Sequence, residues 1–129
     1  INQCLCLAAN GDTKTAVNKA YELSLKNEDD NQVKRLLAWV LICDGNAEKA
    51  LNIYNELINT DKRPDDALNM AYAYWISGSP TEAKNSFTEW LINHPGANLE
   101  HEFENDSYVF KSNGITEVDR ALMLSAINK

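Results

Sequence analysis

Three glycines recur along the chain at nearly equal intervals, and the residues around them recur as well. Gly11, Gly45 and Gly78 are 34 and 33 residues apart. Counting the glycine itself, six positions of the repeat hold residues of similar kind in the three copies, with one exception. Periods of roughly 20 to 50 residues are typical of repeat architectures. The sequence therefore predicts a stack of similar structural units.

The six positions form a pattern of small and large side chains around each glycine. Small and large apolar residues follow one another in the same order in every copy. The one exception is Ala20 in the first copy, where the other copies have an aromatic residue. The trios, in the order of the three copies, are Cys4, Ala38, Ala71; Leu7, Leu41, Tyr74; Ala16, Ala50, Ala83; Ala20, Tyr54, Phe87; and Leu23, Leu57, Trp90, with the three glycines as the sixth.

Each copy is predicted to form a helix, a tight turn and a second helix. In the third copy the first helix is expected over about 65–77. Ser79 is then expected as N-cap, Pro80 as the first helical residue and Glu82 as the partner in a capping box, and Pro95 ends the second helix. The second copy predicts helices over about 31–44 and 47–59 with Asn46 as N-cap, and in the first copy Asp12 or Thr13 caps the second helix.

The turn glycines and the small residues have a physical cause. A glycine after a helix takes the left-handed conformation that ends it. Two helices joined by so short a turn run antiparallel and need small side chains where their backbones come closest. The large apolar residues then lie between one pair and the next, because no single pair buries its apolar face alone.

With these columns in place, the sequence resembles the tetratricopeptide repeat family. Departures from the family pattern are Lys34 and Ala67, where a tryptophan is usual, and Lys62, where a proline is usual. The resemblance implies an all-α, right-handed superhelix of antiparallel helix pairs. The residues that carry it are Ala38, Leu41, Gly45, Ala50, Tyr54 and Leu57 in the second copy and Ala71, Tyr74, Gly78, Ala83, Phe87, Trp90 and Pro95 in the third.

The last third of the chain matches the repeat less well. We predict a single domain over residues 1–129, with repeats at about 1–30, 31–63 and 64–97 and a degenerate capping hairpin at about 98–129. That hairpin is expected to have one helix within about 99–112 and another from about 117 to 128, because a solenoid needs an atypical end. Its acidic residues are expected to be solvated, or else to form a docking surface for a basic partner; they are Glu100, Glu102, Glu104 and Asp106.

Composition narrows the class of partner. Twelve basic and nineteen acidic residues give a net charge of −7, which disfavours binding to nucleic acid or to anionic lipid. No apolar run is long enough to insert into a membrane. The three cysteines are expected to be unpaired, as in a reducing compartment, so we predict a cytoplasmic location. The sequence begins in the middle of the repeat pattern, and we expect it to be a fragment of a longer chain.

No motif points to catalysis. The sequence has no glycine-rich phosphate loop, no paired-cysteine motif and no zinc-protease motif. His101 and Glu104 form the one local pair with a catalytic or metal-binding composition, and surface histidines beside acids are common. We therefore predict no enzyme activity, no catalytic residues, no metal site and no cofactor.

The family resemblance implies a concave groove, lined by the first helix of each pair, that binds an extended or helical peptide. Aromatic side chains are frequent anchors of protein interfaces, and three of them fall on this face. Arg35 and Asn69 are expected to fix polar orientation, with Arg35 meeting an acidic group. The predicted groove residues are Arg35, Trp39, Ile42, Leu68, Asn69, Tyr72 and Trp75.

The sequence thus predicts a non-catalytic module that binds a protein or peptide partner in an aromatic groove. One alternative is a structural or self-assembly element, in which the C-terminal hairpin or a second copy of the chain fills the groove. Under that alternative the rings are internal packing and the chain can form a homo-oligomer. Another alternative is an accessory repeat domain of a larger protein.

Overall fold

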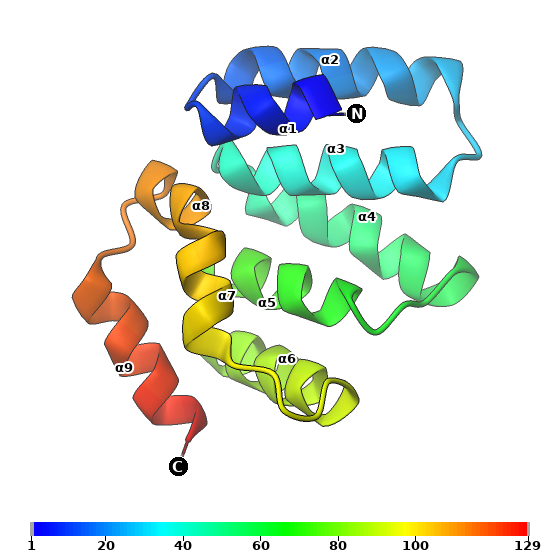
Figure 1. Cartoon of the computed structure of the whole chain (residues 1–129). Helices are drawn as coiled ribbons and strands as arrows, with labels where there is room; N and C mark the ends of the chain where they lie inside the picture. Colours follow the sequence, from blue (N-terminus) through cyan, green and yellow to red (C-terminus); the bar gives the residue numbers. More distant parts are fainter. Residues whose placement is uncertain (1, 129) are drawn as a thin grey trace.

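Residues 2–128, which this computed structural model describes, form nine helices and no strands (Figure 1). The predicted all-α fold class is confirmed. In chain order the helices are α1 (Asn2–Ala9), α2 (Thr13–Lys26), α3 (Asn31–Cys43), α4 (Ala47–Thr60), α5 (Asp66–Ile76), α6 (Pro80–Asn93), α7 (Leu99–Asn105), α8 (Ser107–Ser112) and α9 (Glu117–Ile127).

The first six helices pack as three hairpins that lie one against the next. Helices α1 and α2, α3 and α4, and α5 and α6 pack together, while α2 contacts α3 and α4 contacts α5. Figure 1 shows the three hairpins in layers, from the blue pair at the top to the green pair at the bottom. This packing is compatible with a helical-repeat fold, and the helix bounds agree with the predicted ones within one or two residues.

The three turn glycines adopt the predicted left-handed conformation, with φ values of 89°, 83° and 91°. After each glycine the next amide closes the turn by donating to a carbonyl five residues back. These bonds are Asp12 to Leu7, Asn46 to Leu41 and Ser79 to Tyr74, at 2.8–2.9 Å. This closure is the Schellman motif, in which the amide after the left-handed residue bonds to a carbonyl of the last helical turn.

The small column is buried without exception. Ala16, Ala50 and Ala83 each have 0% of their surface exposed. Tyr54 and Phe87, from the aromatic column, are also fully buried, and they fill the space between the helices. A larger side chain at the alanine positions would therefore force the paired helices apart.

The predicted capping box at Ser79 and Glu82 is wrong. Helix α6 begins with Pro80 as expected, but the Ser79 side chain makes no capping hydrogen bond. A capping box is present instead at the start of α9, where Thr116 accepts from the backbone of Asp119 and the Asp119 carboxylate accepts from Thr116.

The C-terminal hairpin differs from the other three. The single helix expected within 99–112 is two short helices, α7 and α8, which meet at Asp106. Helix α8 packs against α3, two hairpins away in the stack, and α9 packs against α6 and α7. Figure 1 shows α7 crossing the hairpins instead of lying alongside them. Helices α7 and α8 are therefore folded back over α5 and α3, whereas α9 lies against α6.

All three cysteines are free thiols; Cys4 and Cys43 are buried, and Cys6 is exposed. No helix among residues 2–128 has both the length and the apolar character required to cross a bilayer.

Candidate functional site

The predicted groove residues lie on α3 and α5, and most of them are inside the molecule. Tyr72 and Ile42 are completely buried, and Trp39 and Leu68 are less than one tenth exposed. Arg35, Asn69 and Trp75 are half-buried. The side chain of Ile42 lies in the apolar core of the hairpins, in the same cluster as Trp39, Leu68 and Tyr72.

Residues 99–112, which we call the strap, cover this aromatic surface. The Tyr72 ring lies 6.0 Å from the Phe103 ring and 5.2 Å from the Phe110 ring. The Trp75 ring lies 5.7 Å and 5.4 Å from the same two rings. Tilted and edge-to-face contacts at these distances are favourable for aromatic pairs. The groove residues and the strap therefore form one aromatic cluster.

Two polar anchors connect the aromatic surface to the strap. The Tyr72 hydroxyl donates to Asp106 Oδ2 at 2.8 Å, at the break between α7 and α8. Trp39 Nε1 donates to the Tyr108 hydroxyl at 2.9 Å. Each anchor satisfies the polar tip of an otherwise apolar side chain, as buried tyrosine and tryptophan require.

A third anchor lies at the C-terminal end of α3, where helix carbonyls have no partner within the helix. Ser112 Oγ donates to the carbonyl of Cys43 at 3.0 Å. Asn113 Nδ2 donates to the carbonyl of Ile42, also at 3.0 Å. The repeat pattern does not predict either residue, because nothing local to Ser112 and Asn113 indicates which helix end they reach.

The acidic stretch of α7 is not uniformly solvated, which corrects one expectation. Glu100 and Glu104 are exposed, but Asp106 is partly buried against Tyr72. Burial raises the pKa of Asp106 above its ordinary value, and the nearby Glu102 adds to that rise. Burial also raises the pKa of Tyr72, and Asp106 contributes further. The Asp106 carboxylate is therefore a structural contact of the strap.

Two further groups at the strap are shifted by burial. Burial raises the pKa of Tyr108 to about 12 and that of the Cys43 thiol to about 12, with a smaller contribution to Cys43 from Asp106. At neutral pH both groups are protonated. A thiol in this state is a poor nucleophile, because the thiolate is the reactive form.

Arg35 is held by two carboxylates of its own chain. Its guanidinium makes two bonds of 2.8 Å to the carboxylate of Asp66 and one of 3.1 Å to Asp61 Oδ2. Asp66 is the one buried charged residue among those described, at 6% exposure. The sequence predicts that Arg35 meets an acidic group of a partner. Such a group would first have to replace the bonds to Asp61 and Asp66.

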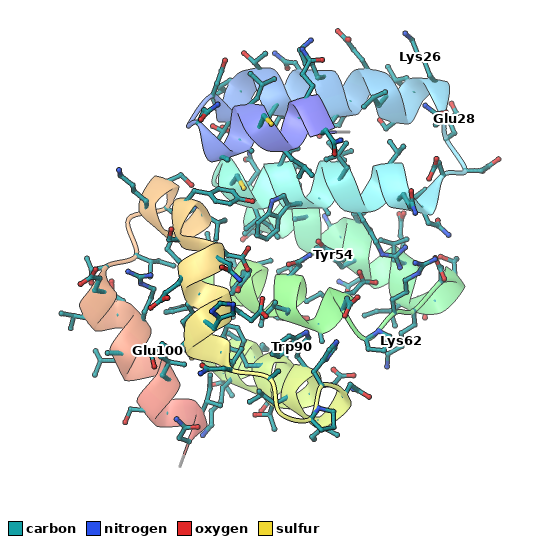
Figure 2. All side chains as sticks on the ribbon, in the orientation of Figure 1. Lys26, Glu28, Tyr54, Lys62, Trp90 and Glu100 are labelled. Carbon is teal, nitrogen blue, oxygen red and sulfur yellow. The ribbon has the colours of Figure 1, made fainter. Side chains whose placement is uncertain are left out.

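Asn69 faces the interior of the second and third pairs. Its amide neighbours the hydroxyl of Tyr54, whose pKa burial raises. The Tyr54 hydroxyl is fully buried and has no hydrogen bond of normal geometry. Figure 2 shows Tyr54 near the centre of the molecule, at the level of α4 and α5. The Asn69 amide and the Tyr54 hydroxyl are thus two polar groups side by side within the apolar core.

Part of Trp75 remains accessible in a cleft of about 510 Å³ between α6 and α9. Leu122, which is 65% exposed, stands at its edge. Lys84 is its only basic lining residue and makes no ion pair among the described residues. The lining is Trp75, Pro80, Thr81, Lys84, Asp119, Leu122, Met123 and Ala126.

No hydrogen bond or ion pair joins the side chains of His101 and Glu104, and both are exposed. His94 is the histidine with defined partners. Its Nε2 lies 2.7 Å from Asp65 Oδ1 and its Nδ1 lies 2.8 Å from the Trp90 carbonyl. Within residues 2–128 no group of three or more histidine, cysteine, aspartate or glutamate side chains is arranged to hold a metal ion.

No protein-family model matches this sequence, and neither a curated protein nor a solved structure matches the chain. The functional inferences below therefore depend on the repeat and on the contacts within the chain.

Proposed function

We propose that the chain is a non-catalytic protein-interaction module of the tetratricopeptide-repeat type, with a concave surface on α3 and α5 that binds a partner helix. The family assignment is supported by the six repeated columns and by the three turns of the same geometry. The observation that carries the function is the strap, because the aromatic surface already holds a helical segment.

The strap depends on that surface for its conformation. Its two helices have seven and six residues, and isolated helices so short are marginal in water. Leu99, Phe103, Val109 and Phe110 of the strap are each at most 5% exposed. A surface that orders such a segment within the chain has the chemistry to order a similar segment of a partner.

The strap also sets a condition on binding. A tethered segment competes at an effective concentration on the order of millimolar. A partner that makes the same contacts must reach similar concentrations, or gain additional contacts elsewhere, in order to displace the strap. The proposed module is therefore closed in the free chain and opens by exchange.

A structural element is the second candidate, and the complete burial of Tyr72 favours it. Under this reading the aromatic cluster is permanent packing that joins the last hairpin to the others. The two candidates differ in one measurable property, which is whether the strap separates from the surface without unfolding of the hairpins.

Hydrogen exchange of the full chain, followed by mass spectrometry, tests this difference. If the chain is an interaction module, the strap amides should exchange through local opening. The free energy of that opening should be lower than the free energy of opening for the amides of α3 and α5. Exchange of the strap only together with global unfolding would contradict the module and support the structural element.

A matched pair of substitutions on α7 sharpens the measurement. Phe103→Ala removes a ring of the cluster, and it should accelerate exchange in the strap with little change in α2 and α4. Glu104→Ala, at the exposed neighbouring position, should leave the exchange of every helix unchanged. Equal acceleration in all helices by Phe103→Ala would count against a separable strap.

A further inference from the structure

We propose that Asn113 is a site of spontaneous deamidation, and that its conversion to an acid releases the end of the strap from α3. The site is the sequence Asn113-Gly114, which directly follows α8. The sequence Asn10-Gly11, which directly follows α1, provides an internal control. The inference concerns the covalent chemistry of the chain and does not depend on whether the concave surface binds a partner.

The first step of the reaction closes a ring within the chain. The backbone nitrogen of Gly114 attacks Cγ of the Asn113 side chain, and a bond forms between these two atoms. The bond from Cγ to Nδ2 breaks, and Nδ2 leaves as ammonia with the proton that the glycine nitrogen loses. The product is a cyclic succinimide. Glycine favours the attack, because no side chain stands beside its nitrogen and its backbone is the least restricted.

The second step consumes one water molecule. Water opens the succinimide on the Cγ side to give aspartate, or on the backbone side to give isoaspartate, whose main chain runs through Cγ. In both products an amide has become a carboxylic acid. The reaction as a whole thus takes up water, releases ammonia and needs no other reactant.

In the folded chain the turn after α8 keeps the reacting atoms apart. The ψ angle of Asn113 is 9°, so the Gly114 nitrogen nearly eclipses the Asn113 nitrogen, whereas ring closure requires it on the side of Cβ. The amides of Asn113 and Ile115 fix this turn by donating to the carbonyl of Phe110, at 3.1 and 3.0 Å. Gly114 itself donates to the carbonyl of Lys111. Deamidation therefore requires that the end of the strap first opens.

The group that deamidation removes is the one that connects this turn to α3. Asn113 Nδ2 donates to the carbonyl of Ile42 at 3.0 Å and to that of Val109 at 2.8 Å. Figure 1 shows α8 beside this end of α3. The amide nitrogen thus satisfies one carbonyl at the C-terminal end of each of the two helices.

The product acid cannot replace these contacts. An ionised carboxylate has no proton to donate to either carbonyl. Helix C-termini carry a partial negative charge, so a carboxylate at the ends of α3 and α8 is unfavourable. Isoaspartate also lengthens the main chain, which moves the Ile115 amide away from the carbonyl of Phe110. Either product weakens the attachment of α8 to α3, and a strap end that has opened once is then hindered from closing.

Asn10 combines the same sequence with a different environment. Its side chain is exposed and makes no hydrogen bond to the other residues between 2 and 128. Deamidation at this position removes no contact with the strap. The two sites therefore separate the chemistry of the reaction from its structural consequence.

The first test measures the reaction at both sites in the same sample of full chain. Peptide mapping by mass spectrometry gives the two rates at mildly alkaline pH, in buffer and in urea. The two sites should react at similar rates in urea, and Asn113 should react at least about tenfold more slowly in the folded chain. Phe103→Ala should accelerate the reaction at Asn113 by the factor by which it accelerates exchange of the α8 amides, with Asn10 unchanged.

Two outcomes of this test overturn the site. One is a rate at Asn113 that is equal in buffer and in urea, since the fold then does not control the reaction. The other is a folded chain that stays unmodified at Asn113 while the sample in urea converts completely. If the strap opens in hydrogen exchange and Asn113 still does not react, the site is wrong and the proposed function stands.

The second test measures the consequence and does not need the Phe103 variant to fold. Asn113→Asp reproduces one of the products, and its α8 amides should exchange about tenfold faster than those of the wild type, with α2 and α4 unchanged. Wild-type chain that has been aged until Asn113 is converted should show the same acceleration. Asn10→Asp is the matched control and should leave α8 unchanged. Equal exchange of α8 in Asn113→Asp and in the wild type would overturn the release of the strap.

Discussion

The three hairpins and the C-terminal strap are both helical, yet they are held in different ways. Within the hairpins, each helix packs on its neighbours in the chain, and the same small and large positions meet in every copy. The strap makes its contacts far away in sequence, since Trp39 and Tyr108 are 69 residues apart. Periodic packing is thus encoded locally, whereas the strap depends on a surface that exists only after the hairpins have stacked.

The two regions also differ in the balance of apolar and polar contacts. The hairpins are joined mainly by apolar packing around residues with no exposed surface. The strap combines aromatic packing with three polar anchors, at Asp106, at Tyr108 and at the end of α3. Apolar burial is not directional, but hydrogen bonds are, so the anchors determine where along the surface the strap lies.

The largest expected effect is in the core of the hairpins. Phe87→Ala should reduce the free energy of unfolding by about 3–5 kcal/mol, because it leaves a cavity at a fully buried position. Chemical denaturation followed by circular dichroism measures the loss. Ile92→Ala, at an exposed position of the same helix, is the control and should change stability by less than about 0.5 kcal/mol.

Phe110→Ala provides the matching change in the strap, at a position that is almost as buried. If the strap is a separable unit, this substitution should accelerate exchange in α7 and α8 more than it lowers the midpoint of global unfolding. A global loss as large as that of Phe87→Ala, with no local acceleration, would remove the distinction between the two regions.

The next effect concerns the ion pair that connects α3 to the start of α5. Arg35→Met should destabilise the chain by about 2–3 kcal/mol, because it leaves the buried carboxylate of Asp66 without its charged partner. The double variant Arg35→Met/Asp66→Leu should recover much of this loss, since apolar pairs often replace buried ion pairs without cost. Denaturation of the four chains measures the coupling, and strictly additive losses would contradict it.

A smaller effect is expected at the polar anchor of the strap. Tyr72→Phe should cost about 1–2 kcal/mol, mostly as faster exchange of the strap, because it removes the bond to Asp106. Folding raises the pKa of Asp106, so the protonated form of this residue stabilises the folded chain. This stabilisation is complete below the ordinary aspartate pKa of 3.8 and is lost as pH rises through the pKa of Asp106 in the folded chain. Tyr72→Phe should raise this pKa further, and a carboxyl carbon-13 titration that shows a fall would contradict the assignment.

The smallest effect is a pH dependence at His94, whose ring stacks on that of Trp90. The Trp90 carbonyl and the Asp65 carboxylate both accept from the ring, so its charged form is favoured and its pKa is raised above 6.5. This contribution to stability is complete below pH 6.5 and is lost as pH rises through the folded pKa. Asp65→Asn should lower the pKa of His94 in a proton NMR titration. Glu48→Gln, beside the opposite end of α5, should leave it unchanged.

Much of the fold was predictable from local pattern. The turn at Gly45 and the close contact at Ala50 follow from short-range geometry, because a left-handed residue and a small side chain are required there whatever surrounds the pair. The capping box at Ser79 was predicted from the same kind of local pattern, and this prediction is wrong. Thr116 and Asp119 form a capping box at the start of α9 instead. A capping motif permits a hydrogen bond but does not decide the side-chain rotamer that makes it.

The candidate site was less predictable. Trp39 and Tyr72 lie on neighbouring first helices, with their rings 6.1 Å apart, as the repeat register implies. Trp75 contacts the same two strap rings as Tyr72. The register did not indicate that Arg35 is held by Asp61 and Asp66, since those acids come from the connection to the next pair and the start of its first helix.

The sequence by itself determined the helices, the turns and the stacking of three pairs, because each depends on residues within one repeat or its neighbour. Only the tertiary structure decided what covers the aromatic surface. The break at Asp106 and the return of α8 to α3 depend on hydrogen bonds and ring contacts between residues 34 and 69 positions apart. Local periodicity carries no information about such contacts, because their free energy is gained only once both surfaces have formed.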